Sequence, residues 1–135
     1  MTSDLRVMVI DDEKIVGKRL KPALSKSGYE VEIFEDAHVA LERFAERPVD
    51  IVVTDIRMDE IDGIEVLERV LAIDPRTKVI IITGYATVEM AREALTKGAF
   101  DFIAKPFKPD DLRATIKEAV KALTSTGNDA PTGNP

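Results

Sequence analysis

Five short apolar runs alternate with five helical patterns along the chain, and this alternation constrains the fold more than any other feature. Four of the runs are continuous, which is typical of strands buried on both faces of a parallel sheet. A weaker run of Val31, Ile33 and Phe34 alternates in part, which suits a strand at the edge of a sheet. The four continuous runs are Val7–Ile10, Ile51–Val53, Val79–Ile82 and Phe102–Ala104.

The segments between these runs carry an apolar residue every three or four positions. Such spacing predicts helices that each bury one face. The five apolar stripes cover residues 16–24, 37–44, 64–71, 88–95 and 112–123. Gly28, Pro48, Pro75 and Gly98 lie where these helices should end. Pro22 lies inside the first helical pattern, so we expect that helix to bend there.

Strict alternation of strands and helices predicts an α/β fold. We expect a (βα)5 doubly wound parallel sheet with right-handed crossovers and helices on both faces. The expected sheet is flavodoxin-like, with the strand order 2-1-3-4-5. A length of 135 residues fits one domain, which we place at residues 1–123. Residues 124–135 are polar and are predicted to form a disordered tail or a linker stub.

The composition excludes several classes of function. A net charge of −6 argues against nucleic-acid binding by this domain, because phosphate backbones need a basic surface. The absence of cysteine excludes disulfides, thiolate metal sites and thiol nucleophiles. No apolar run is long enough to cross a membrane, and the start of the chain has no signal-peptide layout. We therefore expect a cytoplasmic protein without a membrane partner.

Polar residues follow or end four of the predicted strands. Asp11 and Asp12 follow the first strand, Asp55 ends the third, Thr83 ends the fourth and Lys105 follows the fifth. In a doubly wound sheet, ligands bind outside the carboxyl ends of the strands. The predicted fold therefore brings three carboxylates, a hydroxyl and an ammonium group to one edge of the sheet.

This set of side chains favours phosphoryl chemistry beside a divalent metal ion. Three neighbouring carboxylates repel one another unless a cation compensates, and oxygen ligands without His or Cys favour Mg²⁺. A metal ion, a lysine and a threonine can together surround the oxygens of a phosphoryl group, while a remaining carboxylate attacks phosphorus. The turn at 11–14 reads Asp-Asp-Glu-Lys and lacks the glycines that cradle nucleotide phosphates.

With these residues at the strand ends, the chain resembles the receiver domains of two-component response regulators, over residues 5–123. The matching signatures are Asp11-Asp12, Asp55, Thr83 and Lys105-Pro106, each at the end of a predicted strand. Asp62-Gly63 and the segment Gly98–Phe102 are also similar to family segments. Within the family, the chain looks like a single-domain chemotaxis receiver or like the receiver of a sigma-54-type transcription activator.

The resemblance assigns a role to each residue of the predicted site. It implies that Asp55 is the phosphoacceptor and that Lys105 contacts the phosphoryl group. It implies a metal site made of Asp12 as a direct ligand, Asp11 as the acidic partner that holds metal-bound water, Asp55, and the backbone carbonyl of Arg57. The expected ion is Mg²⁺, with Mn²⁺ as a substitute.

The resemblance also implies a conformational switch. Thr83 matches the switch hydroxyl, and Phe102 matches the aromatic residue that turns inward when the hydroxyl moves. The change would alter the face made by the fourth helix, the fifth strand and the fifth helix, which is also the expected face of a homodimer. The Lys105–Pro106 peptide bond is expected to be cis.

By the same resemblance, the protein would act as a phosphorylation-controlled signalling switch. A sensor histidine kinase would donate the phosphoryl group to Asp55, and the chain itself would catalyse only its own phosphorylation and dephosphorylation with Mg²⁺. An alternative is a phosphoryl shuttle in a multistep phosphorelay. A metal-dependent phosphohydrolase is a third possibility, but Arg57 stands where such an enzyme usually needs a second acidic residue.

Simpler interpretations exist for several of these residues. Asp11-Asp12-Glu13 alone would suit a helix N-cap followed by acidic first-turn residues. Phe102 alone would suit plain core packing. His38 is expected to be a surface residue. Glu65, Glu68 and Arg69 are expected to belong to a solvated helix face.

Overall fold

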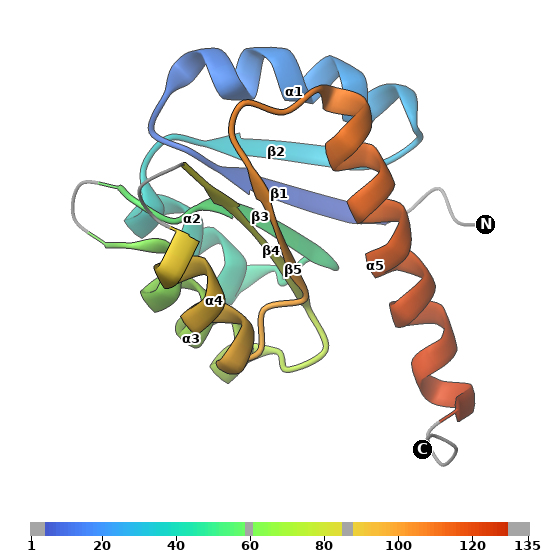
Figure 1. Ribbon diagram of the computed structural model, residues 1–135. Helices are drawn as coiled ribbons and strands as arrows, with labels where there is room; N and C mark the ends of the chain where they lie inside the picture. The colour runs from blue at the N-terminus through green and yellow to red at the C-terminus, as the bar shows by residue number, and fades with distance from the viewer. Residues whose placement is uncertain (1–4, 59–60, 85–87, 130–135) are drawn as a thin grey trace.

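The predicted strands form a single parallel sheet in a computed structural model of the chain, with the order β2-β1-β3-β4-β5 (Figure 1). The structure describes residues 5–58, 61–84 and 88–129, the last five by their backbone alone. The predicted strand order and the parallel pairing are confirmed. The strands are β1 (Arg6–Ile10), β2 (Glu30–Phe34), β3 (Ile51–Asp55), β4 (Lys78–Thr83) and β5 (Asp101–Ala104).

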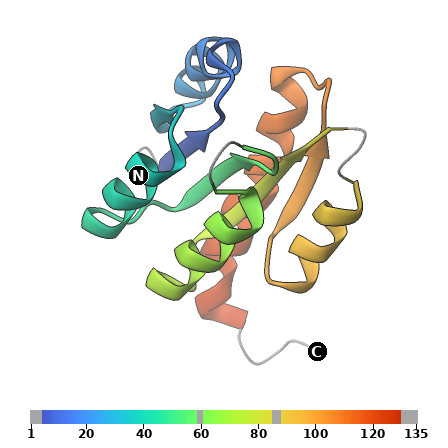
Figure 2. The same ribbon diagram turned by 90° about the vertical axis from the view of Figure 1, so that its left-hand side faces the viewer.

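The helices lie on both faces of the sheet, as predicted. Figures 1 and 2 show α1 and α5 on one face and α2, α3 and α4 on the other. Pro22 lies inside α1. The helices are α1 (Lys14–Lys26), α2 (Ala37–Glu46), α3 (Gly63–Ile73), α4 (Val88–Thr96) and α5 (Pro109–Asp129).

Successive residues of each strand pack alternately into two separate hydrophobic cores. Val7 and Val9 of β1 pack with residues of α1 and α5, whereas Met8 and Ile10 pack with residues of α2, α3 and α4. Because successive side chains of a strand point to opposite faces, each interior strand contributes to both cores. This arrangement buries β3 and most of β1 and β4. It also determines to which face of the sheet each side chain at the carboxyl end of a strand points.

The prediction that the run Phe102–Ala104 is buried on both faces is wrong. Phe102 and Ile103 are half-buried, and Asp101 and Ala104 are exposed. The reason is the position of β5, which pairs only with β4 and therefore stands at an edge of the sheet. The other edge strand, β2, was predicted as such and is confirmed.

Two of the predicted helix ends depend on glycine. Gly28, two residues after α1, has φ +94°, and Gly98, two residues after α4, has φ +109°. Residues with a Cβ rarely adopt such angles, so glycine lets the chain turn from each helix into the next strand.

The fifth helix is longer than the sequence indicated. The predicted tail began at Thr124, but α5 continues to Asp129. The polar residues in this stretch lack an apolar stripe, yet no proline interrupts the helix before Pro131. Residues 130–135, the remainder of the predicted tail, lie outside the described residues.

Within the described ranges, no helix combines the length and the apolar character needed to cross a membrane.

Candidate functional site

The polar residues predicted to meet at one edge of the sheet do so. Ile10 of β1 pairs with Thr54 of β3, so the next residues along the two strands, Asp11 and Asp55, stand side by side. Asp55 in turn pairs with Ile82 of β4, one residue before Thr83. Figure 2 looks onto this edge, from which the chain leaves β1, β3, β4 and β5.

Three carboxylates form a compact cluster at this edge. Oxygen atoms of Asp11, Asp12 and Asp55 all lie within 4.8 Å of one another. Asp11 and Asp55 are buried, with 1% and 7% of their surface exposed, whereas Asp12 is exposed. Two carboxylates of the cluster are therefore enclosed by the protein, and the third faces the solvent.

Burial raises the pKa values of the two inner carboxyl groups. The pKa of Asp55 rises to about 6, first because its carboxylate is desolvated and next because the charge of Asp11 lies close by, while Lys105 opposes the rise. Desolvation also raises the pKa of Asp11, against a hydrogen bond from the backbone N–H of Glu13 and the charge of Lys105. The site thus contains more negative charge than its protein surroundings compensate.

One oxygen of Asp11 indicates what kind of group would compensate. Oδ1 accepts a hydrogen bond of 2.9 Å from the backbone N–H of Glu13, but Oδ2 is buried without a hydrogen-bond partner. The ammonium group of Lys105 lies 3.5 Å from Oδ2, longer than a charge-assisted hydrogen bond. Buried polar atoms without partners are rare in proteins. An oxygen-only cluster with one unsatisfied oxygen fits a hard divalent cation.

Lys105 provides the positive charge of the site. Its Nζ lies 2.8 Å from Glu13 Oε1, 3.5 Å from Asp11 Oδ2 and 3.7 Å from Asp55 Oδ2. Burial lowers the pKa of Lys105, but the hydrogen bond to Glu13 and the charges of Asp11 and Asp55 outweigh burial, so the pKa is raised overall. Lys105 therefore stays charged and faces three anions.

The start of α3 supports the backbone beneath Asp55. Asp62 caps this helix by accepting a hydrogen bond from the N–H of Glu65, and the N–H of Gly63 donates to the carbonyl of Ile56. A Cβ atom on Gly63 would lie 2.6 Å from the carbonyl oxygen of Asp55 and 2.7 Å from the Cα of Ile56. Only glycine allows the helix to approach the strand end so closely.

Thr83 and Phe102 stand near each other on the α4 side of the sheet. Ile81 pairs with Phe102 and Thr83 with Ala104, so Thr83 and Phe102 are diagonal neighbours on the same face. Thr83 is fully buried, and its hydroxyl donates to the carbonyl of Gly84. Phe102 is half-buried and packs against the core under α2, α3 and α4.

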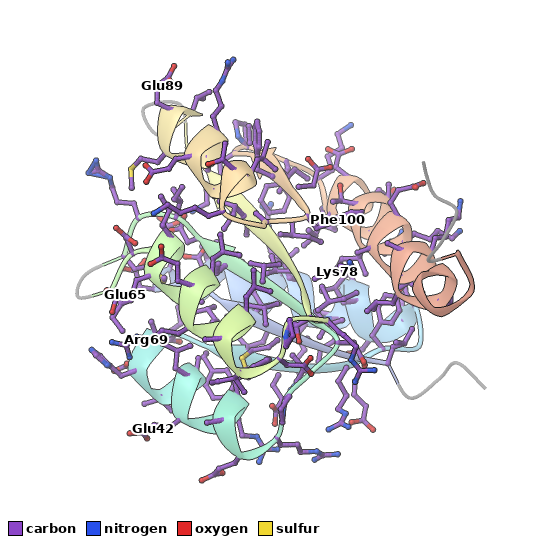
Figure 3. The ribbon with its side chains drawn as sticks, turned by 90° about the horizontal axis from the view of Figure 1, so that it is seen from below. Glu42, Glu65, Arg69, Lys78, Glu89 and Phe100 are labelled. Atoms are coloured by element: carbon purple, nitrogen blue, oxygen red, sulfur yellow. The ribbon has the colours of Figure 1, made fainter. Side chains whose placement is uncertain are left out.

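The remaining predicted residues have simpler surroundings. The Arg57 side chain is exposed, and the Lys105–Pro106 bond is cis, as expected. His38 is exposed, as the sequence predicted. Glu65 and Arg69 form an exposed ion pair of 2.7 Å on the outer side of α3 (Figure 3), which confirms that they belong to a solvated helix face.

The sequence did not reveal two residues of the site. Glu13, interpreted only as a first-turn acidic residue, forms the shortest ion pair of Lys105 among the described residues. Gly63 was noted as part of a family segment, but its close approach to Asp55 was not predicted. The spacing of Asp62-Gly63 seven residues after Asp55 was a usable signal for Gly63. No sequence signal distinguishes Glu13 from an ordinary solvated glutamate.

Comparison with known proteins places this site in a family. Residues 7–117 match the family model described as the response regulator receiver domain. The chain belongs to the response regulator receiver family. The resemblance stated from the sequence is thereby confirmed, and the carboxylate cluster lies within the matched residues.

Relatives of this receiver domain include both longer regulators and single domains. It is 40% identical over 121 residues to the regulatory protein AtoC of Escherichia coli K12, covering 90% of this chain but 26% of that relative. It is 37% identical to the transcriptional regulatory protein FixJ of Bradyrhizobium diazoefficiens, covering 90% of this chain and 59% of FixJ. The chain thus spans only part of the length of these curated relatives.

Solved structures agree with the fold. A CheY-like receiver domain protein from Methanospirillum hungatei superimposes with a TM-score of 0.85 at 32% identity, covering 90% of this chain and 97% of that one. NtrX from Brucella abortus, described in complex with ADP, gives a TM-score of 0.86 at 30% identity, covering 93% of this chain and 29% of NtrX. The receiver fold is therefore shared by compact single domains and by parts of larger regulators.

Proposed function

We propose that Asp55 accepts a phosphoryl group from a sensor histidine kinase, and that this modification switches the signalling state of the receiver domain. The observation that carries the proposal is the cluster at the end of β3. Asp55 lies there beside two further carboxylates and one lysine, at an open edge of the sheet. Membership of the receiver family supports the same reaction.

The proposed reaction is an in-line transfer. An oxygen of Asp55 attacks phosphorus, the new O–P bond forms as the N–P bond of the phosphohistidine breaks, and the bond pair stays on the imidazole nitrogen. A pKa of about 6 leaves Asp55 mainly ionised at neutral pH, so it is available as a nucleophile. The ammonium group of Lys105 is placed to offset charge on the phosphoryl oxygens.

A metal ion would complete the site. Asp11, Asp12, Asp55 and the backbone carbonyl of Arg57 would hold Mg²⁺, or Mn²⁺ as a substitute. The ion would offset the charge of the cluster and of the transferred phosphoryl group. The buried unsatisfied oxygen of Asp11 supports this assignment. On this proposal, the chain catalyses only its own phosphorylation and dephosphorylation.

Thr83 and Phe102 would carry the change to a binding surface. Their diagonal positions on β4 and β5 support a coupled movement, in which the hydroxyl turns to the phosphoryl group and the ring follows. The half-buried state of Phe102 supports a ring that can be exposed or buried at low cost. The affected face consists of α4, β5 and α5, and a homodimer through this face is part of the proposal.

The test combines phosphorylation with a stable phosphoryl analogue. A small phosphodonor such as acetyl phosphate, with Mg²⁺, should add the mass of one phosphoryl group to the native chain and none to Asp55→Asn. Beryllofluoride with Mg²⁺ should shift the NMR signals of Thr83 and Phe102, again only in the native chain. Equal shifts in both chains would refute the proposal.

The alternative phosphoryl shuttle predicts a different fate for the phosphoryl group. If a radiolabelled phosphoryl group moves from Asp55 to a histidine of a transfer protein, and not to water, the shuttle is indicated.

A further inference from the structure

The nearest partner of Lys105 is not the proposed phosphoacceptor. Its Nζ forms a hydrogen bond of 2.8 Å with Oε1 of Glu13, whereas Asp55 Oδ2 lies 3.7 Å away. A charge-assisted hydrogen bond is normally 2.7–2.9 Å long, so only the contact with Glu13 has full strength. In the unmodified protein, Glu13 therefore holds one of the three N–H donors of Lys105 and attracts its charge.

Apart from the contact with Lys105, the side chain of Glu13 has no hydrogen bond or ion pair among the described residues. Glu13 is the N-cap residue of α1, but its side chain forms no capping hydrogen bond. Its backbone N–H is held by Asp11 Oδ1, which fixes where the side chain starts. Glu13 and Lys105 also line a cleft of about 410 Å³ between α1 and the chain after β5, together with Val16 and Phe107.

We propose that Glu13 is a positioning residue that holds Lys105 in the resting state and competes with the phosphoryl group for its ammonium group. This inference rests on the proposed function, because it assigns the competitor of the phosphoryl group at the same site. Phosphorylation then requires Lys105 to exchange the carboxylate of Glu13 for phosphoryl oxygens. Glu13 thereby sets how readily the modified state forms.

The contact is weak enough to be exchanged. The side chains of Glu13 and Lys105 are 59% and 27% exposed, so water competes with the ion pair. Exposed ion pairs contribute little to stability. Removing the charge of Glu13 should therefore change the affinity of the site for a phosphoryl analogue by roughly two- to fivefold.

The experiment compares Glu13→Gln with Glu35→Gln. Glu35 is an exposed glutamate after β2 that lines a hollow with Asp12, and it forms no ion pair among the described residues. The Glu35→Gln substitution therefore removes one negative charge near the carboxylate cluster without changing a partner of Lys105. Beryllofluoride is titrated at saturating Mg²⁺ and followed by NMR. The ¹³Cε signal of Lys105 is recorded in metal-free protein as a separate readout of the resting contact.

The proposal predicts two results. Glu13→Gln shifts the Lys105 ¹³Cε signal and binds beryllofluoride roughly two- to fivefold more tightly, whereas Glu35→Gln changes neither. Unchanged or weaker binding in Glu13→Gln overturns the inference, and so does an equal gain in both variants, which would indicate general charge repulsion. If the native chain does not bind beryllofluoride, the proposed function itself fails. If it binds normally and only the Glu13 result is negative, the proposed function stands without this inference.

Discussion

An aspartate lies at each end of β3, Asp50 just before the strand and Asp55 as its last residue, and the two have very different surroundings. At the amino end, Asp50 accepts a 2.8 Å hydrogen bond from the N–H of Arg6, and its own backbone groups pair with Arg6 and Lys78. At the carboxyl end, the carboxylate of Asp55 is buried beside Asp11, and its distance to Lys105 is 3.7 Å. The first carboxylate joins strands together, whereas the second is left with uncompensated charge.

The difference shows how one strand can serve stability and function at once. The hydrogen bond at Asp50 stabilises the place where three strands begin. Burial with incomplete compensation raises the pKa of Asp55 to about 6, which a nearby cation would oppose. Perturbed carboxyl groups of this kind tend to cluster at functional sites.

The largest expected difference between the two aspartates is in phosphorylation. Asp55→Asn should abolish the Mg²⁺-dependent gain of a phosphoryl group, because an amide cannot form the acyl phosphate. Asp50→Asn should be phosphorylated at the native rate, since Asp50 lies at the opposite end of the strand. Intact-protein mass spectrometry with acetyl phosphate measures both. Loss of phosphorylation in both variants would show that the two aspartates do not differ in function.

The second difference concerns stability as a function of pH in metal-free protein. The folded state binds the Asp55 proton more tightly than the unfolded state, so stability should fall as the pH rises from 3.8 to about 6. The contribution of Asp55 to this loss should be about 2–3 kcal/mol, since one pKa unit corresponds to about 1.4 kcal/mol. Asp55→Asn should remove this part of the pH dependence.

Urea unfolding at both ends of this pH range, in the presence of a chelator, provides the measurement. The native-minus-variant difference gives the contribution of Asp55 together with its coupling to Asp11, whose pKa is also raised and whose contribution has the same sign. At pH values above about 6, adding Mg²⁺ should restore the free energy of unfolding, because a ligand that binds only the folded state stabilises it. A variant with the native pH dependence would show that burial does not perturb Asp55.

A smaller effect tests how firmly the backbone at the carboxyl end is held. Gly63→Ala should cost about 2 kcal/mol of stability and slow phosphorylation, because its Cβ would lie 2.6 Å from the carbonyl oxygen of Asp55. Gly17→Ala is the matched control. Its Cβ would lie within clashing distance of Cγ2 of Ile33, a stiff β-branched side chain, so it too creates a steric clash, but in α1 and away from Asp55.

Gly17→Ala should therefore also cost about 2 kcal/mol of stability but leave phosphorylation unchanged. Thermal or urea unfolding measures the cost of each variant. Slowed phosphorylation in both variants would mean that lost packing, and not the position of the Asp55 backbone, slows the reaction.

The smallest effect belongs to the amino end. Asp50→Ala should cost about 1 kcal/mol, the usual net contribution of one hydrogen bond, because the N–H of Arg6 loses its acceptor. Phosphorylation should remain native. Urea unfolding near neutral pH measures the cost, and a coupled loss of phosphorylation would show that the two ends of β3 are not independent.

Much of the fold could be predicted because the relevant signals are local. The continuous runs at Val7–Ile10 and Val79–Ile82 identify buried strands, and their strict alternation with helices determines a parallel sheet. Once the sheet is parallel, the strand ends meet, so Asp11 and Asp55 could be placed together before any contact was known. The burial of β5 was misjudged because an edge position depends on pairing, which a single run does not encode.

The finer parts of the site could not be predicted because they depend on tertiary distances. The partner of Lys105 is decided by the side-chain conformation of Glu13, and no spacing rule gives this conformation. The role of Gly63 depends on how closely α3 approaches β3. The extension of α5 to Asp129 escaped prediction because that stretch has no apolar periodicity.

The separation of the two ends of β3 also has a practical meaning for protein engineering. A strand of about five residues holds its ends roughly 17 Å apart. Turns at the amino edge, such as the one around Pro75 and the exposed Arg76, are therefore remote from the carboxylate cluster. Foreign sequence, such as an epitope tag or a fluorescent reporter, can be inserted there, whereas an inserted residue within β3 would turn Asp55 to the other face of the sheet.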